Sequence, residues 1–236
     1  MSAELSYSHR AKQELCRIMP RHEGCVLAEI AAACQASGRL TIRQGRGALE
    51  INSELPAQAR RLFALIKEHT GEISYIRAVE THRLNKKKYY VLSLDTAYMK
   101  LLEEAGIYGK DGRITRAVPE WIKRTCCARA YIRSLFLFCG SAVDPKKAYH
   151  IEFVLHDKAH AQSVVSLLER LQIKARMTTR KANDIVYIKD ADTISELFAG
   201  IGAHEAMLEQ EDTRILKDMR NNVNRVVNWE TANINK

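Results

Sequence analysis

Apolar residues in the first hundred positions follow a helical period in some stretches and a strand period in others. Tyr7, Ala11 and Leu15 recur at helical spacing behind Ser6, a residue type that favours the N-cap of a helix. Leu40 and Ile42 alternate with polar residues, which predicts a strand. The same rules predict further helices over residues 24–36, 56–69 and 96–105, and strands over 39–43, 49–52, 73–84 and 88–94.

The pattern then starts again after a segment punctuated by glycine and by Pro119. It predicts helices over 126–139, 156–171 and 193–201, and strands over 149–155, 175–180 and 184–189. Gly38 and Gly140 each follow the first helix of a unit and lie 102 residues apart. We therefore expect an α+β fold of two α-β-β-α-β-β-α repeats, related by a pseudo-twofold axis with their first helices side by side.

The last segment differs from both repeats. Its sequence is compatible with one helix, but six asparagines lie between residues 221 and 235. Asparagine is a poor helix former, so we expect these amides to have assigned hydrogen-bond partners. We divide the chain into residues 1–110 (N-terminal helix and first repeat), 111–203 (linker and second repeat) and 204–236 (helical tail).

Charge and cysteine content narrow the function. The formal net charge is +9, and such a surface favours polyanions because displaced counterions supply affinity. No apolar run reaches the length of a membrane span and the N-terminus lacks a secretory core, so we expect a cytoplasmic protein without a membrane partner. The six cysteines contain no CxxC pair and no histidine at zinc-finger spacing, so we expect buried thiols, no metal site and no cofactor.

His156 and His160 are four residues apart at a predicted helix start, a spacing that could hold a metal ion. A third ligand does not accompany them. Helix capping and surface solvation therefore explain the two histidines better.

Three segments carry a resemblance to a known family. The sequence IRSLFLFCGSAVDPKKAYHIEFVL resembles a degenerate LAGLIDADG motif, and IAAACQASGRLTI is a weaker copy of it. The tail MRNNVNRVVNWETANINK closely resembles the WhiA family of bacterial transcription regulators and cell-division factors. The resemblance implies a LAGLIDADG-like first part and a helix-turn-helix DNA-binding domain after it. This sequence stops at Lys236, about where the linker to that domain would begin.

LAGLIDADG nucleases use a metal-binding carboxylate at the end of each motif helix. Alignment on the two glycines places Ser37 and Cys139 at these positions, and neither is an ionised oxygen ligand for Mg²⁺. Asp144 lies past the turn in the second repeat, and the first repeat has no counterpart. The resemblance therefore implies a non-catalytic, nucleoid-associated regulator of transcription, sporulation, cell division and chromosome segregation, with double-stranded DNA as its partner.

With the apolar strand residues directed inward, basic side chains and hydroxyls occupy the outer sheet faces, a pattern suited to phosphate contacts. Thr41, Thr178 and Tyr187 are the interleaved hydroxyls, and the loops add Lys86 and Lys87. Glu50 and Glu152 point to the same faces and oppose phosphate. The candidate DNA-binding residues are Arg39, Arg43, Arg46, Arg77, Lys88, Lys146, Lys147, Arg176, Arg180, Lys181, Lys189, Arg220 and Arg225.

Two alternatives remain open. The chain could be a protein-interaction module that binds transcription machinery or another regulator through the asparagine-rich tail, without affinity for DNA. It could also be a metal-dependent endonuclease, whose cutting would depend on Asp144.

Overall fold

The computed structural model describes residues 5–43, 46–80, 88–108 and 114–234. After α1 (Tyr7–Leu15), the first unit contains α2 (Glu23–Ser37), β1 (Gly38–Arg43), β2 (Arg46–Ser53), α3 (Pro56–Thr70), β3 (Tyr75–Glu80), β4 (Lys88–Leu94), the short helix η1 (Thr96–Tyr98) and α4 (Met99–Glu104). The second unit contains α5 (Thr125–Cys139), β5 (Gly140–Ala142), β6 (Ile151–Leu155), α6 (Lys158–Arg170), β7 (Arg176–Arg180), β8 (Asn183–Ile188) and α7 (Ala191–Ile201). The helix α8 (His204–Ile234) follows.

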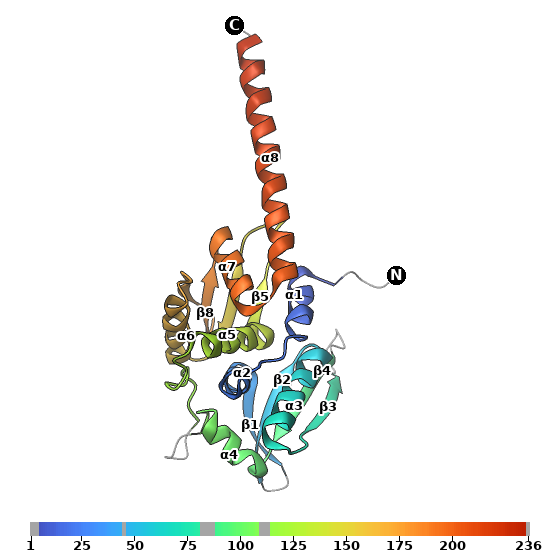
Figure 1. The fold of residues 1–236 in the computed structure, drawn as a ribbon, viewed down its shortest axis with the longest axis vertical. Helices are drawn as coiled ribbons and strands as arrows, with labels where there is room; N and C mark the ends of the chain where they lie inside the picture. The colour runs from blue at the N-terminus through green and yellow to red at the C-terminus, as the bar shows by residue number, and fades with distance from the viewer. Residues whose placement is uncertain (1–4, 44–45, 81–87, 109–113, 235–236) are drawn as a thin grey trace.

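Both units form a four-stranded antiparallel sheet of the same topology. The strand orders are β1-β2-β4-β3 and β5-β6-β8-β7. The predicted α+β architecture of two repeats is thus confirmed (Figure 1). The predicted strand over 73–84 is shorter in the described residues, and its continuation with Lys86 and Lys87 lies outside them.

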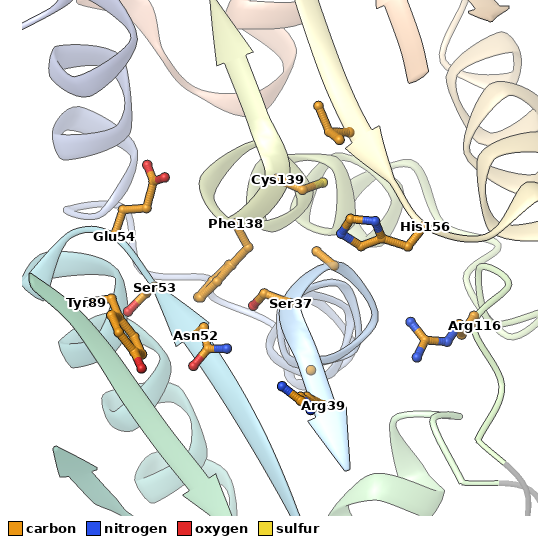
Figure 2. A pocket seen from close by; sticks show the side chains of 13 residues that line it. Ser37, Arg39, Asn52, Ser53, Glu54, Tyr89, Arg116, Phe138, Cys139 and His156 are labelled. Atoms are coloured by element: carbon orange, nitrogen blue, oxygen red, sulfur yellow. The ribbon is translucent and has the colours of Figure 1, made fainter. Parts of the chain in front are cut away.

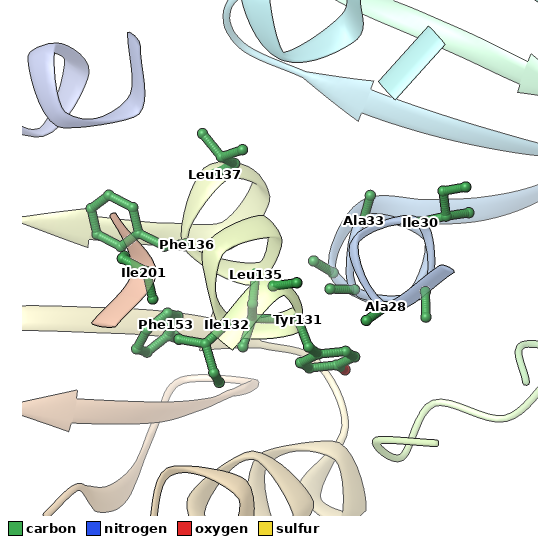
Figure 3. Packing of buried hydrophobic residues seen from close by; sticks show 14 of the residues in the cluster. Ala28, Ile30, Ala33, Tyr131, Ile132, Leu135, Phe136, Leu137, Phe153 and Ile201 are labelled. Atoms are coloured by element: carbon green, nitrogen blue, oxygen red, sulfur yellow. The ribbon is translucent and has the colours of Figure 1, made fainter. Parts of the chain in front are cut away.

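The two motif helices α2 and α5 pack side by side at the centre of the molecule (Figure 3). Ala28 and Ala130 occupy equivalent positions 102 residues apart, and both are almost fully buried. Small side chains let two helix backbones approach closely, while Ile132 and Leu135 extend the apolar core toward the second sheet. The expectation that the first helices of the repeats lie together is confirmed.

Gly38 and Gly140 end these helices where the chain turns directly into a strand. A Cβ atom on Gly38 would lie 3.0 Å from the carbonyl carbon of Cys34, and one on Gly140 would lie 2.6 Å from the Cα of Phe136. Such contacts with backbone cannot be relieved by a change of rotamer. The close approach of strand to helix therefore requires glycine at both positions.

A buried carboxylate joins three helices near the middle of this helix pair. Glu29 of α2 accepts hydrogen bonds from Arg61 of α3 at 2.6 and 2.8 Å, and from Arg133 of α5 at 2.8 Å. The side chains of Glu29 and Arg61 are only 1% and 2% exposed. Two guanidinium groups thus compensate one desolvated carboxylate, and the cluster holds both units in one arrangement.

A second polar network crosses the same interface. The Tyr131 hydroxyl donates to Oε1 of Gln35 and lies 2.8 Å from Nε2 of His160. Gln35 in turn donates to the carbonyls of Thr115 and Ala117 in the segment between the units. Burial lowers the pKa of His160 to about 4, so the imidazole is neutral at pH 7. The expected exposure of His160 is therefore wrong.

The apolar side of β1 is less covered than alternation predicts. Leu40 and Ile42 do lie in a strand, but they are 62% and 82% exposed. Leu49, the cross-strand neighbour of Leu40, is buried, because β2 is an inner strand and β1 is at the edge of the sheet. The helical layer covers the centre of this sheet and leaves its edge open.

The tail is helical, as expected, and most of it projects from the molecule (Figure 1). Its first turns are anchored, because Glu14 of α1 accepts the backbone N–H groups of Glu205 and Ala206. From Asp218 to Thr231 every residue is exposed. No helix in the described residues is long and apolar enough to cross a membrane.

Replacing Glu29 by Gln should lower the free energy of unfolding by about 3–5 kcal/mol, because Arg61 then stays buried without its counter-charge. Urea unfolding followed by circular dichroism measures this change. The control is Glu80→Gln, which breaks an exposed ion pair with Lys88 and should cost less than about 1 kcal/mol. Equal losses in both variants would contradict the proposed importance of the cluster.

Acidification from pH 7 to pH 5 should destabilise the protein by about 2 kcal/mol through His160. The unfolded histidine binds a proton near pH 6.5, whereas the folded one resists protonation until about pH 4, so stability is lost as pH falls through this window. The contribution should disappear in His160→Gln and persist in His204→Gln, whose histidine is exposed. Urea unfolding at both pH values tests this; an unchanged pH dependence in His160→Gln would refute it.

Candidate nucleic-acid interface

The outer face of the second sheet gathers basic and hydroxyl side chains. Cross-strand pairing places Arg176 opposite Tyr187, with Thr178 and Arg180 on the same face of β7. Lys189 continues this face beyond β8, and its Nζ lies 5.3 Å from the centre of the Tyr187 ring. These five exposed or half-exposed side chains form one surface with donors suited to phosphate oxygens.

The outer face of the first sheet has a similar but smaller set. Arg39 of β1 pairs with Glu50 of β2, and Thr41 follows on the same face. Arg77 of β3 reaches across and donates to both carboxylate oxygens of Glu50, at 2.9 and 3.0 Å. The side chains of Arg43 and Arg46, at the end of this hairpin, lie outside the described residues.

A glutamate occupies the equivalent position on each outer face, as the sequence analysis expected. Glu50 and Glu152 lie on the second strand of their sheets, 102 residues apart. Each forms an ion pair with an arginine, Glu50 with Arg77 at 2.9 Å and Glu152 with Arg180 at 3.4 Å. In the described part of the chain Arg39 and Arg176 form no ion pair, so positive charge remains on both faces.

Other predicted residues lie elsewhere. Lys88 pairs with Glu80 and, by alternation along β4, lies on the helix-covered side rather than beside Arg77, so its assignment to the outer face is wrong. Lys146 and Lys147 lie in the β5–β6 loop, whose Pro145 carbonyl accepts a hydrogen bond from Lys217 of α8. Lys181 occupies the exposed β7–β8 turn, and Arg220 and Arg225 lie on the projecting part of α8.

A cavity opens between the two units at the ends of the motif helices (Figure 2). Its volume is about 760 Å³. Ser37 and Cys139, the positions that the resemblance aligns with nuclease carboxylates, both line it. The other lining residues are Ala36, Gly38, Arg39, Asn52, Ser53, Glu54, Tyr89, Arg116, Phe138, Val154 and His156.

Ser37 and Cys139 direct their hydrogens back into their own helices. The Ser37 hydroxyl donates to the Ala33 carbonyl at 3.3 Å, and the Cys139 thiol donates to the Leu135 carbonyl at 3.3 Å. Burial raises the pKa of Cys139 to about 12, so this thiol stays protonated and uncharged at neutral pH. Neither group offers an anionic oxygen to a divalent cation.

The cavity contains a carboxylate that the sequence analysis did not identify. Glu54 follows β2 directly, and His156 follows β6 at the equivalent position of the second unit. The repeat spacing of 102 residues could have identified this pair. Asp144, by contrast, accepts a hydrogen bond from the backbone N–H of Lys146 in a turn and is not among the residues that line this cavity. Its closeness to Cys139 in the sequence therefore does not bring its carboxylate to the cavity.

The cations at the cavity also come from distant segments. Arg39 is the second residue of β1, Arg116 lies in the segment between the units, and both line the cavity (Figure 2). Burial lowers the pKa of Lys12 of α1, and the nearby carboxylate of Glu54 opposes this shift. His156 contacts Asn183 at 2.7 Å, so it and the buried His160 do not form a histidine pair at one site.

Comparisons with known proteins agree with this arrangement. Residues 23–108 match the model of the WhiA N-terminal LAGLIDADG-like domain, and residues 128–220 match that of the WhiA LAGLIDADG-like domain. Proteins named "Probable cell division protein WhiA" from Heliobacterium modesticaldum and Alkaliphilus metalliredigens are 42% and 39% identical to the chain. Both alignments cover 98% of this chain, and 74% and 75% of the respective relatives.

Solved structures show the same fold. Full-length WhiA from Thermatoga maritima superposes with a TM-score of 0.75 at 21% identity, over 97% of this chain and 73% of that chain. The homing endonuclease I-DmoI, in a complex with DNA and Mn, superposes with a TM-score of 0.55 at 13% identity, over 76% of this chain and 98% of that chain. With two matched LAGLIDADG-like units and relatives of this identity and coverage, the chain belongs to the WhiA family.

Proposed function

We propose that this protein is a non-catalytic regulator that binds double-stranded DNA along the outer faces of its two sheets. The observation that carries the proposal is the pair of basic outer sheet faces, one on each of two units with the same strand order. Arg39 and Arg77 belong to one face, and Arg176, Arg180 and Lys189 to the other. A duplex has its own approximate twofold symmetry, so two equivalent faces can follow its backbone together.

The similarity in fold to I-DmoI supports DNA as the partner, because that protein was solved in a complex with DNA. The net charge of +9 supplies the general attraction to a polyanion. Glu50 and Glu152 neutralise part of each face through their arginine partners. We therefore expect moderate, salt-sensitive affinity for duplex DNA. Sequence-specific recognition would belong mainly to the helix-turn-helix domain that the family resemblance implies for full-length members.

We further propose that the protein holds DNA without cutting it. Phosphodiester hydrolysis on this scaffold would require carboxylates that bind metal ions from both units. Ser37 and Cys139 stand at the aligned positions, and the carboxylate of Glu54 comes from the first unit alone. Arg39 and Arg116 at the same cavity provide cations for a phosphate group in place of bound metal ions.

A cellular role follows from the family. Relatives named as cell-division proteins make a function in bacterial division the natural context. We propose that the protein acts in the cytoplasm, on the nucleoid, and regulates transcription, sporulation and chromosome segregation in step with division.

A second candidate function is supported by α8. Its projecting part exposes apolar side chains that recur at helical spacing. They are Ile215, Leu216, Met219, Val223, Val226, Val227 and Trp229. Such a stripe suits contact with another protein, so transcription machinery or another regulator is the second partner class.

The double variant Arg176→Ala/Arg180→Ala should bind mixed-sequence duplex DNA more weakly than the wild type. Loss of two phosphate contacts should reduce the slope of log K against log salt by about 2. The freed Glu152 adds repulsion and weakens binding further. Fluorescence anisotropy of a labelled duplex, titrated at several salt concentrations, measures both effects.

The control is Arg60→Ala/Lys67→Ala, which removes the same charge from the exposed side of α3. It should lower affinity slightly and leave the slope nearly unchanged. An identical slope in the wild type and in Arg176→Ala/Arg180→Ala would exclude the second sheet face as the site. Absence of any binding at low salt would move the function to protein contacts, and cut DNA in the presence of Mg²⁺ would refute the non-catalytic assignment.

A further inference from the structure

Three cysteines from two distant segments meet where the motif helices begin. Cys25 lies in the first turn of α2, and Cys126 and Cys127 lie in the first turn of α5. Their sulfur atoms all lie within 4.8 Å of one another, and the Sγ atoms of Cys25 and Cys127 are 3.9 Å apart. The sequence predicts no metal site, because no CxxC pair occurs within any one segment and the cluster forms only when distant segments meet.

These distances match those of thiolates around a single metal ion. Zinc–sulfur bonds of about 2.3 Å in tetrahedral geometry place neighbouring sulfur atoms about 3.8 Å apart. The 3.9 Å between the Sγ atoms of Cys25 and Cys127 is close to this value. The sulfur of the more exposed Cys126 lies within 4.8 Å of both and completes a triangle of possible ligands.

We propose that Cys25, Cys126 and Cys127 form a binding site for a thiophilic metal ion of the Zn²⁺ class. Soft thiolate ligands select such ions over Mg²⁺ and Ca²⁺. Three protein ligands leave a fourth coordination position, which solvent can fill on the side of the half-buried Cys126.

The surroundings favour negative charge on this cluster. All three cysteines lie in the first turn of a helix, where the positive end of the helix dipole favours a thiolate. Although burial acts in the opposite direction, hydrogen bonds from Cys25 and Cys127 and the charge of Arg124 leave the pKa of Cys126 below its ordinary value.

The other two thiols must be deprotonated by the metal ion itself. Burial raises the pKa of Cys25 to about 12 and also raises the pKa of Cys127. A cation that binds at neutral pH therefore releases these protons to solvent, and its affinity increases with pH.

A metal ion at this position would join the two units at the start of the α2–α5 pair. Gly24 makes the approach possible, because a Cβ there would lie only 3.2 Å from the Cys127 sulfur. Binding to the folded state alone stabilises it, so the midpoint of thermal unfolding should rise with Zn²⁺ and return after chelation.

The first test is titration of the reduced full chain with Co²⁺, which reports thiolate ligands by an intense sulfur-to-cobalt charge-transfer band in the near ultraviolet. The band should appear at one equivalent and disappear when Zn²⁺ is added. Cys126→Ser, a half-exposed position that should not disturb folding, should weaken binding by about tenfold or more. Cys16→Ser removes a half-buried cysteine outside the cluster and should bind like the wild type.

Circular dichroism must show that both variants are folded before the titrations are compared. Absence of the charge-transfer band in the wild type would overturn the proposal, as would equal binding by Cys126→Ser and the wild type. Loss of the band in Cys16→Ser alone would also overturn it. If Cys126→Ser is unfolded, Cys127→Ala in the presence of Zn²⁺ serves instead, and an undiminished thermal shift there would exclude the site.

Discussion

The structure depends on one buried carboxylate. Glu29 lies on α2 with Arg61 of α3 on one side and Arg133 of α5 on the other. Its desolvation would be prohibitive without both guanidinium groups, and two buried cations could not remain without it. The three side chains satisfy one another only when α2 and α5 adopt a single relative position. That position determines where the ends of the two motif helices, and hence the cavity, are placed.

The same helix pair explains why the two sheets can act together. Each sheet begins where its motif helix ends, because Gly38 and Gly140 let the chain turn directly from helix to strand without an intervening loop. The orientation of the helices is therefore transmitted directly to β1 and β5. Equivalent residues such as Glu50 and Glu152 therefore take equivalent places on the outer faces of the two sheets.

The cavity lies where the two motif helices end, and its polar groups differ from the paired carboxylates that a LAGLIDADG nuclease uses to bind metal ions. An uncharged hydroxyl and a protonated thiol occupy the ends of the motif helices, and cationic side chains from β1 and the segment between the units lie beside them. A phosphate group near arginine needs no metal ion for charge compensation. This arrangement is the basis of our proposal that the protein holds a nucleic-acid backbone without hydrolysing it.

The local pattern of apolar and polar residues in the sequence determined most of the secondary structure and the presence of two repeats. Alternation and helical period predicted the order of helices and strands except for the short β5, and the 102-residue spacing of Gly38 and Gly140 predicted two repeats with adjacent first helices. Alternation also placed Arg176, Arg180 and Tyr187 on one sheet face. These properties follow from the backbone geometry of each element, which depends on residues close together in the chain.

Only the tertiary structure decided what covers each face and which distant residues meet. Leu40 and Ile42 are exposed because the helical layer does not reach the edge strand, and His160 is buried because α6 packs against Tyr131. Glu54 reaches the cavity, and Cys25 reaches Cys127, through the packing of α2 against α5. Periodicity states which residues share a face of an element, whereas burial and site assembly depend on how elements pack, and that is a property of the whole chain.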